Sequence, residues 1–121
     1  MARILIIDDS PTELKKLTGM LERLGHQVLR AANGGDGVAL ARQEKPDAVL
    51  MDIVMPGMNG FQATRQLTKD GSTATIPIII ITSKDQETDR VWGARQGAQA
   101  YLTKPFEESA LVAALQNVLV G

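Results

Sequence analysis

The sequence contains no cysteine, few aromatic residues and almost no net charge. Of its 121 residues, 3% are aromatic, and 14 acidic side chains stand against 13 basic ones. The absence of cysteine excludes disulfides, thiolate metal sites and cysteine nucleophiles, so an apolar core must stabilise the fold. Because Lys and Arg are not in surplus, the overall charge attracts neither nucleic acid nor an anionic membrane surface. We therefore expect neither as a partner.

Long apolar runs are also missing. No run approaches the length of a membrane span, and the apolar start of the chain meets Asp8 and Asp9 too early for a signal peptide. At this length, a hydrophobic content of 44% is enough for the core of one compact domain. We expect a single cytoplasmic domain over residues 1–121, without an output domain.

Short apolar runs alternate with segments of helical period along the chain. The runs are Ile4–Ile7, Gln27–Ala31, Ala48–Met51, Ile76–Ile81 and Ala98–Leu102. The fourth run is apolar almost throughout, which indicates a strand buried on both faces. This alternation is typical of repeated βα units, and it predicts a doubly wound α/β fold with a five-stranded parallel sheet and five helices.

Helix signals follow each of these runs. Ser10 can cap the first helix, and Pro11 suits its first position. Glu13 would complete a capping box with Ser10, and Gly25 ends the helix. The other helices are expected after Asn33 and before Pro46, from near Asn59, over Asp85–Gln96 and over Glu107–Leu119.

Polar residues stand at the carboxyl ends of four of the expected strands. They are Asp8 and Asp9 after the first strand, Asp52 after the third, Thr82 after the fourth and Lys104 after the fifth. Ligands of open α/β sheets bind at this edge, where three converging carboxylates repel one another unless a cation joins them. Taken singly, Asp8 and Asp9 could be helix-capping or turn residues, and Asp52 could be a solvated strand end. Together they predict a functional site for Mg²⁺, which prefers oxygen ligands.

Four motifs carry a family resemblance over essentially the whole chain. In chain order they are Ile7–Ser10, Asp52–Gly60, Ile81–Ser83 and Tyr101–Phe106. With these motifs the chain resembles a response-regulator receiver domain of the CheY-like, or flavodoxin-like, fold, which implies the strand order 2-1-3-4-5. In the segments Ser10–Glu13 and Phe61–Leu67 it is similar to a stand-alone receiver of the type IV pilus twitching-motility pathway.

The resemblance implies that Asp52 is the phosphoacceptor, which takes a phosphoryl group from a histidine kinase. Asp9, Asp52 and the backbone carbonyl of Val54 would bind Mg²⁺ directly. Asp8 would act mainly through a coordinated water. These residues would form the metal site of a receiver domain.

Other residues would respond to the phosphoryl group. The resemblance implies that Thr82 and Lys104 bind its oxygens and that the bond from Lys104 to Pro105 is cis. Thr82 and Tyr101 would move together on phosphorylation. The output face would contain Trp92, Tyr101 and Phe106.

Two positions tune the lifetime of the phosphoryl group in this family, and here they hold Val54 and Lys84. A valine side chain has no donor or acceptor with which to orient an attacking water. We therefore expect slower self-dephosphorylation than in receivers with Asn at the position of Val54.

We expect a stand-alone regulator with at most self-phosphorylation and self-dephosphorylation activity. Its partners would be a histidine kinase and a downstream protein such as a motor or a pilus component, and the chain would be a monomer or a weak dimer. One alternative is a phosphate sink that drains a shared kinase. Another is an Mg²⁺-dependent aspartyl phosphatase, but such enzymes need a second acid two residues after the nucleophile, where this chain has Val54. The only histidine, His26, is expected to be a surface or loop residue rather than a phosphorelay histidine.

Overall fold

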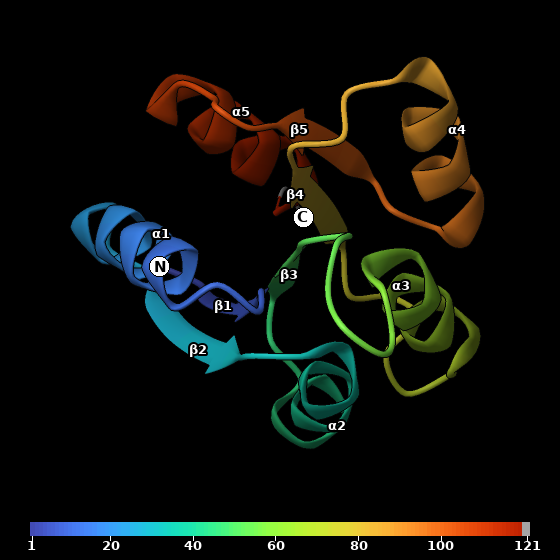
Figure 1. Ribbon diagram of the computed structural model, residues 1–121. Helices are drawn as coiled ribbons and strands as arrows, with labels where there is room; N and C mark the ends of the chain where they lie inside the picture. The colour runs from blue at the N-terminus through green and yellow to red at the C-terminus, as the bar shows by residue number, and fades with distance from the viewer. Residues whose placement is uncertain (120–121) are drawn as a thin grey trace.

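The computed structural model describes residues 1–119, and one parallel sheet forms its centre. Its strands are β1 (Arg3–Ile7), β2 (Gln27–Ala31), β3 (Ala48–Met51), β4 (Ile78–Thr82) and β5 (Ala100–Thr103). The helices are α1 (Pro11–Arg23), α2 (Gly34–Glu44), α3 (Gly60–Lys69), α4 (Glu87–Gln96) and α5 (Glu108–Val118). The strand order is β2-β1-β3-β4-β5, as the resemblance implied, and every neighbouring pair is parallel (Figure 1).

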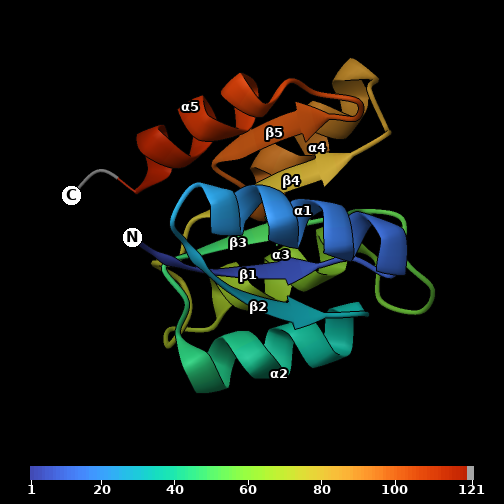
Figure 2. The same ribbon diagram turned by 90° about the vertical axis from the view of Figure 1, so that its left-hand side faces the viewer.

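The helices form two layers, one on each face of the sheet. Helices α1 and α5 cover one face, and α2, α3 and α4 cover the other (Figure 1, Figure 2). Successive strand residues point to opposite faces, so Ile6 packs in the core beneath α1 and α5 whereas Ile7 packs beneath α2 and α3. The prediction that the fourth apolar run is buried on both faces is confirmed for Ile78–Ile81. Within residues 1–119, no helix combines the length and the apolar character that crossing a membrane requires.

Strand β4 begins later than the sequence predicted, at Ile78 rather than Ile76. Pro77 has no N–H group to give to the sheet, although its carbonyl oxygen accepts a hydrogen bond from Val49 N at 2.9 Å. The strand also extends beyond its predicted end, through Thr82. This extension carries the Thr82 side chain to the carboxyl edge of the sheet.

Strand β5 also begins later than predicted, because Ala98 belongs to the end of α4. The Ala98 N–H donates to Gly93 O at 3.1 Å, and Gly97 adopts a left-handed conformation with φ of 107°. The strand therefore covers Ala100–Thr103 instead of Ala98–Leu102. The other differences are small: α4 begins at Glu87 and α5 covers Glu108–Val118.

The predicted capping box at the start of α1 is wrong. Ser10 Oγ accepts a hydrogen bond from Glu13 N at 3.3 Å, as expected of a cap. The Ser10 N–H, however, donates to Asp8 Oδ1 at 2.9 Å, so it does not need the Glu13 side chain. A complete capping box is found instead at α3, where the N–H groups of Asn59 and Gln62 each donate to the other residue's side-chain oxygen.

Candidate functional site

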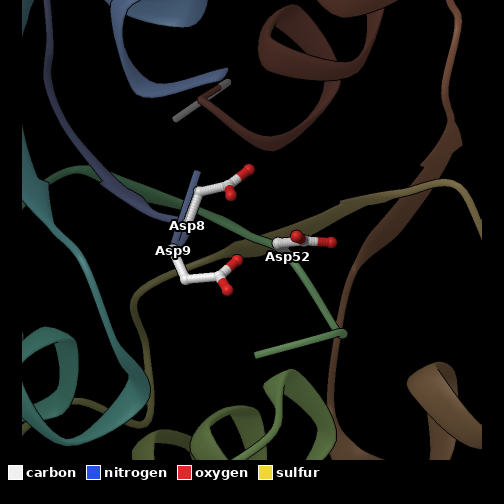
Figure 3. A group of neighbouring side chains, drawn as sticks. All are labelled: Asp8, Asp9 and Asp52. Carbon is white, nitrogen blue, oxygen red and sulfur yellow. The ribbon is translucent and has the colours of Figure 1, made fainter. Parts of the chain in front are cut away.

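Three carboxylates meet where β1 and β3 end. Ile7 and Met51 are paired across these neighbouring strands, and Asp52 N donates a hydrogen bond to Ile7 O at 3.0 Å. The residues that follow the two strands therefore lie side by side. One carboxylate oxygen from each of Asp8, Asp9 and Asp52 lies within 4.8 Å of the others (Figure 3). The structure thus brings together the three acids that the sequence placed at this edge.

The three carboxylates differ in their surroundings. Asp8 is buried, and its Oδ1 is held by the Ser10 N–H. Asp52 is half-buried, and its Oδ1 accepts a hydrogen bond from Ile53 N at 2.8 Å. Asp9 is exposed. The cluster is therefore anchored on one side and reachable by a small ion from solvent on the other.

Burial raises the pKa of the Asp52 carboxyl above its ordinary value, and the negative charge of Asp8 adds to the rise. Lys104, the Ile53 N–H and the Thr82 hydroxyl favour the ionised form, but together they do not cancel the rise. The charged form of Asp52 is therefore less favourable in the folded protein than it is in a fully solvated carboxyl group. A further positive charge at the site would relieve this.

Lys104 supplies the positive charge nearest to the cluster. Its N–H donates to Thr82 O at 2.7 Å, which continues the pairing of β4 and β5 up to the site, and its bond to Pro105 is cis, as the resemblance implied. The Lys104 ammonium lies 3.2 Å from Asp8 Oδ2 and 3.6 Å from Glu13 Oε2. Burial acts to lower the pKa of Lys104, but the nearby carboxylates outweigh it and the pKa is raised. Lys104 therefore remains cationic.

A chain of contacts links the two predicted switch residues. The Thr82 hydroxyl is buried and accepts a hydrogen bond from Lys84 N at 3.4 Å. The Tyr101 hydroxyl donates to Lys84 O at 2.7 Å. Burial raises the pKa of Tyr101 to about 12, so its hydroxyl keeps its proton. Thr82 and Tyr101 therefore both contact the backbone of Lys84, although they come from different strands.

Two residues near the site were not predicted from the sequence. Glu13 carries the signal of a capping residue, and the structure alone shows that its carboxylate lies beside Lys104. Arg90, in α4, lies over the Tyr101 ring at 4.9 Å from its centroid, and its Nη2 donates to Thr103 Oγ1 at 2.8 Å. No sequence motif marks either contact: Glu13 and Lys104 are far apart in the chain, and the Arg90 contacts join α4 to the next element, β5.

The residues predicted for output and lifetime differ in exposure. Trp92 is 49% exposed and its neighbour Val91 is 47% exposed. Tyr101 and Phe106 are half-buried, so the predicted output face combines open and partly covered side chains. Val54 is 57% exposed, which leaves the space beside the acidic cluster open to water.

The donors at this edge fit a hard divalent cation. Asp8, Asp9 and Asp52 offer carboxylate oxygens, the ligands that Mg²⁺ prefers. Among the salt bridges of residues 1–119, this cluster has one basic partner, Lys104, which pairs with Asp8. A divalent cation would offset the negative charge that Lys104 leaves unbalanced.

Comparison with known proteins agrees with this geometry. The family model described as Response regulator receiver domain matches residues 4–116. Protein PilH from Pseudomonas aeruginosa is 74% identical over 121 residues, which cover 100% of both chains. Other curated relatives are 34% to 39% identical and longer, so the chain spans 26% to 52% of their length.

Two solved structures have the same fold. The chemotaxis protein CheY4 from Vibrio cholerae superposes with a TM-score of 0.92 at 30% identity, covering 98% of this chain and 99% of that chain. The receiver domain of a sensor histidine kinase from Pseudomonas aeruginosa superposes with a TM-score of 0.90 at 32% identity, covering 98% and 97%. That structure has a magnesium ion coordinated in its active site cleft.

Proposed function

The chain belongs to the response regulator receiver family, and from this premise we propose that its Asp52 accepts a phosphoryl group from a histidine kinase. The convergence of Asp8, Asp9 and Asp52 with Lys104 at one edge of the sheet carries the proposal. The three clustered carboxylates can bind a divalent cation, and the one ammonium can pair with a negatively charged phosphoryl group.

Asp52 is suited to act as the nucleophile. The Ile53 N–H holds Asp52 Oδ1 at 2.8 Å, which orients the carboxylate and leaves Oδ2 for the attack. Oδ2 attacks phosphorus, the bond between phosphorus and the imidazole nitrogen of the donor breaks, and its electron pair stays on that nitrogen. Such a transfer depends mainly on positioning and on neutralising the phosphoryl oxygens.

The surrounding residues supply that neutralisation. Asp9, Asp52 and the Val54 carbonyl would hold Mg²⁺, with Asp8 acting through water. When bound, Mg²⁺ supplies positive charge to the phosphoryl oxygens. The Lys104 ammonium moves from Asp8 toward one phosphoryl oxygen.

Output follows from the contacts of Thr82 and Tyr101 with Lys84. The Thr82 hydroxyl turns to the phosphoryl group and gives up its contact with Lys84 N, which now measures 3.4 Å. The Tyr101 hydroxyl donates to the same residue's carbonyl, so the two side chains respond together. Phosphorylation shifts a two-state equilibrium by the difference in its stabilisation of the two states.

The downstream role follows the likeness to PilH at 74% identity. We place the chain in type IV pilus twitching motility or chemotaxis-like signalling, as a monomer or weak dimer that docks a motor or pilus component. The exposed Trp92 and Val91 favour an output partner over a pure phosphate sink. A pull-down with beryllofluoride-treated wild type and Asp52→Ala separates the two roles, because a sink has no phosphorylation-dependent partner besides its kinase.

Val54 should lengthen the lifetime of the phosphoryl group. Its side chain is 57% exposed and has no group that can orient a water for attack on the phosphorus. Replacing it by an amide, in Val54→Asn, should shorten the half-life of phosphorylated protein by roughly tenfold, the scale of one hydrogen bond. Loss of label over time after removal of the phosphodonor measures it. An unchanged half-life would contradict this role.

Fluorescence of Trp92, the only tryptophan, tests the proposed function. Beryllofluoride with Mg²⁺ should change the emission of wild type, because this phosphoryl mimic binds a carboxylate and α4 lies next to the switch. The change should disappear without Mg²⁺ and in Asp52→Ala. A response that persists in either case would contradict the assignment of Asp52.

A further inference from the structure

Glu13 competes for the ammonium that the proposed phosphoryl transfer needs. The salt bridges of the described residues join Lys104 to Asp8 Oδ2 at 3.2 Å and to Glu13 Oε2 at 3.6 Å, and none joins it to Asp52. The Lys104 side chain is 18% exposed and that of Glu13 is 30% exposed, so water screens their attraction only in part. To reach a phosphoryl group on Asp52, the ammonium has to leave Glu13.

The local structure explains why Glu13 is available. A glutamate at this helix position often bonds the backbone N–H of the N-cap residue. Here Asp8 Oδ1 already accepts the Ser10 N–H at 2.9 Å. Asp8 thus both contacts Lys104 and releases the Glu13 carboxylate from capping, and no salt bridge of residues 1–119 joins Glu13 to another cation.

We infer that Glu13 is a positioning residue that restrains Lys104 and thereby slows the phosphorylation of Asp52 by small phosphodonors. The inference rests on the proposed function, because it concerns the same transfer. With acetyl phosphate, Asp52 Oδ2 attacks phosphorus, the bond from phosphorus to the acetyl oxygen breaks, and acetate leaves with the electron pair. Lys104 stabilises the charge on the phosphoryl oxygens only while its ammonium is free of Glu13.

The first test is the phosphorylation rate with acetyl phosphate at saturating Mg²⁺. Glu13→Gln keeps the size of the side chain and removes its charge, and it should raise the rate roughly fivefold, the scale of one partly exposed ion pair. Glu22→Gln is the matched control, since it removes the same charge from an exposed position of the same helix. It should leave the rate at the wild-type value. An unchanged rate in Glu13→Gln would overturn the inference.

A double-mutant cycle shows whether Glu13 acts through Lys104. In a Lys104→Met background the ammonium is gone, so adding Glu13→Gln should change the remaining rate by less than about 1.5-fold. If Glu13→Gln raises the phosphorylation rate equally in both backgrounds, the negative charge of Glu13 acts on the site without Lys104, and the inference would be wrong.

A measurement without phosphodonor follows the contact itself. The ¹⁵N resonance of the Lys104 ammonium should shift in Glu13→Gln and stay in place in Glu22→Gln; no shift in either would overturn the inference. The two proposals fail differently. Wild type that is not phosphorylated on Asp52 would overturn both, whereas phosphorylated wild type with the same rate as Glu13→Gln would overturn the role of Glu13 alone.

Discussion

The two edges of the sheet hold charged residues in opposite arrangements. At the amino edge, Arg3 Nη2 lies 2.7 Å from Glu44 Oε1, and Arg3 N donates to Asp47 Oδ2 at 2.8 Å. At the carboxyl edge, three carboxylates cluster within 4.8 Å, and Lys104 pairs with one of them, Asp8. The amino edge matches its charged and polar groups locally, whereas the carboxyl edge keeps a surplus of negative charge.

The charges of the two edges therefore differ in what they can contribute to the stability of the fold. A balanced pair near solvent contributes about 1 kcal/mol or less to stability. A charged carboxylate that is partly buried opposes folding: burial raises the pKa of Asp52, and the negative charge of Asp8 adds to the rise. The carboxyl cluster therefore fits the proposed binding of a cation and a phosphoryl group better than a role in stability.

The largest expected effect tests how tightly the carboxyl edge is built. A Cβ atom at Gly60 would overlap Asp52 O and lie 2.7 Å from Ile53 Cα. Backbone atoms cannot rotate away, so Gly60→Ala should lower the free energy of unfolding by about 3 kcal/mol. Urea denaturation measures the loss. Gly35→Ala, where the nearest atom would be Asn33 Oδ1 at 3.6 Å, should be neutral or stabilising; an equal loss there would contradict close packing at Gly60.

Breaking the balanced edge should weaken the fold and leave the reaction intact. Arg3→Ala removes the ion pair with Glu44 and the hydrogen bond from Arg3 Nη1 to Glu44 O at 2.9 Å. We expect the free energy of unfolding to fall by about 1 kcal/mol, which corresponds to a melting temperature lower by about 4 °C. Phosphorylation by acetyl phosphate should continue at the wild-type rate. A reduced rate in the folded variant would show that the two edges are not independent.

Removing a charge from the unbalanced carboxyl edge should raise the free energy of unfolding rather than lower it. The folded pKa of Asp52 is raised, so the ionised group opposes folding above that pKa and the penalty disappears as the pH falls below the unfolded pKa. Near neutral pH without Mg²⁺, Asp52→Asn should increase the free energy of unfolding by about 0.5 kcal/mol. This value is already reduced for solvent screening. Thermal melts over a pH series measure the gain. In excess Mg²⁺ the wild type should be the more stable of the two proteins. If Asp52→Asn is less stable than wild type without Mg²⁺, the charge of Asp52 does not oppose folding.

The smallest effect belongs to His26, near the amino edge. Its Nδ1 accepts the Ala2 N–H at 3.1 Å, and burial together with the positive N-terminus lowers its pKa from 6.5. Its neutral form therefore stabilises the fold above the unfolded pKa, and this contribution is lost as the pH falls through the folded pKa. His26→Gln should reduce the acid-induced loss of stability by roughly 0.3 kcal/mol. Paired denaturation curves at two pH values measure it; identical pH dependence in both proteins would contradict this assignment.

The sequence was sufficient to predict the sheet and the acidic cluster for one shared reason. Both depend on strands that run parallel, and the apolar runs before Asp8 and Asp52 are clear enough to place their carboxyl ends at one edge. The strand ends were harder to predict, because Pro77 and Ala98 are apolar like strand residues. Pro77 stays outside β4 because it has no N–H to give to the sheet, and Ala98 stays outside β5 because its N–H caps the end of α4.

The environment of Lys104 could not be predicted from the sequence. Glu13 has the spacing of a capping residue, but the Ser10 N–H that it would cap donates to Asp8 instead. The Glu13 carboxylate therefore lies beside Lys104. No motif marks the contacts of Arg90 in α4 with Tyr101 and Thr103 in β5 either. Which carboxylate accepts the Ser10 N–H, and where a long charged side chain finds its partner, leave no pattern in the sequence.

We propose that Asp52 takes the phosphoryl group because the unbalanced carboxyl edge binds Mg²⁺ beside it. Intact-mass measurement after incubation with acetyl phosphate and Mg²⁺ tests it most directly. Wild type and Asp47→Asn, a variant of the balanced edge, should each gain the mass of one phosphoryl group. Asp52→Asn should gain none, and neither should wild type after chelation of Mg²⁺. An adduct that survives either the loss of Asp52 or the loss of Mg²⁺ would show that Asp52 is not the Mg²⁺-dependent phosphoacceptor.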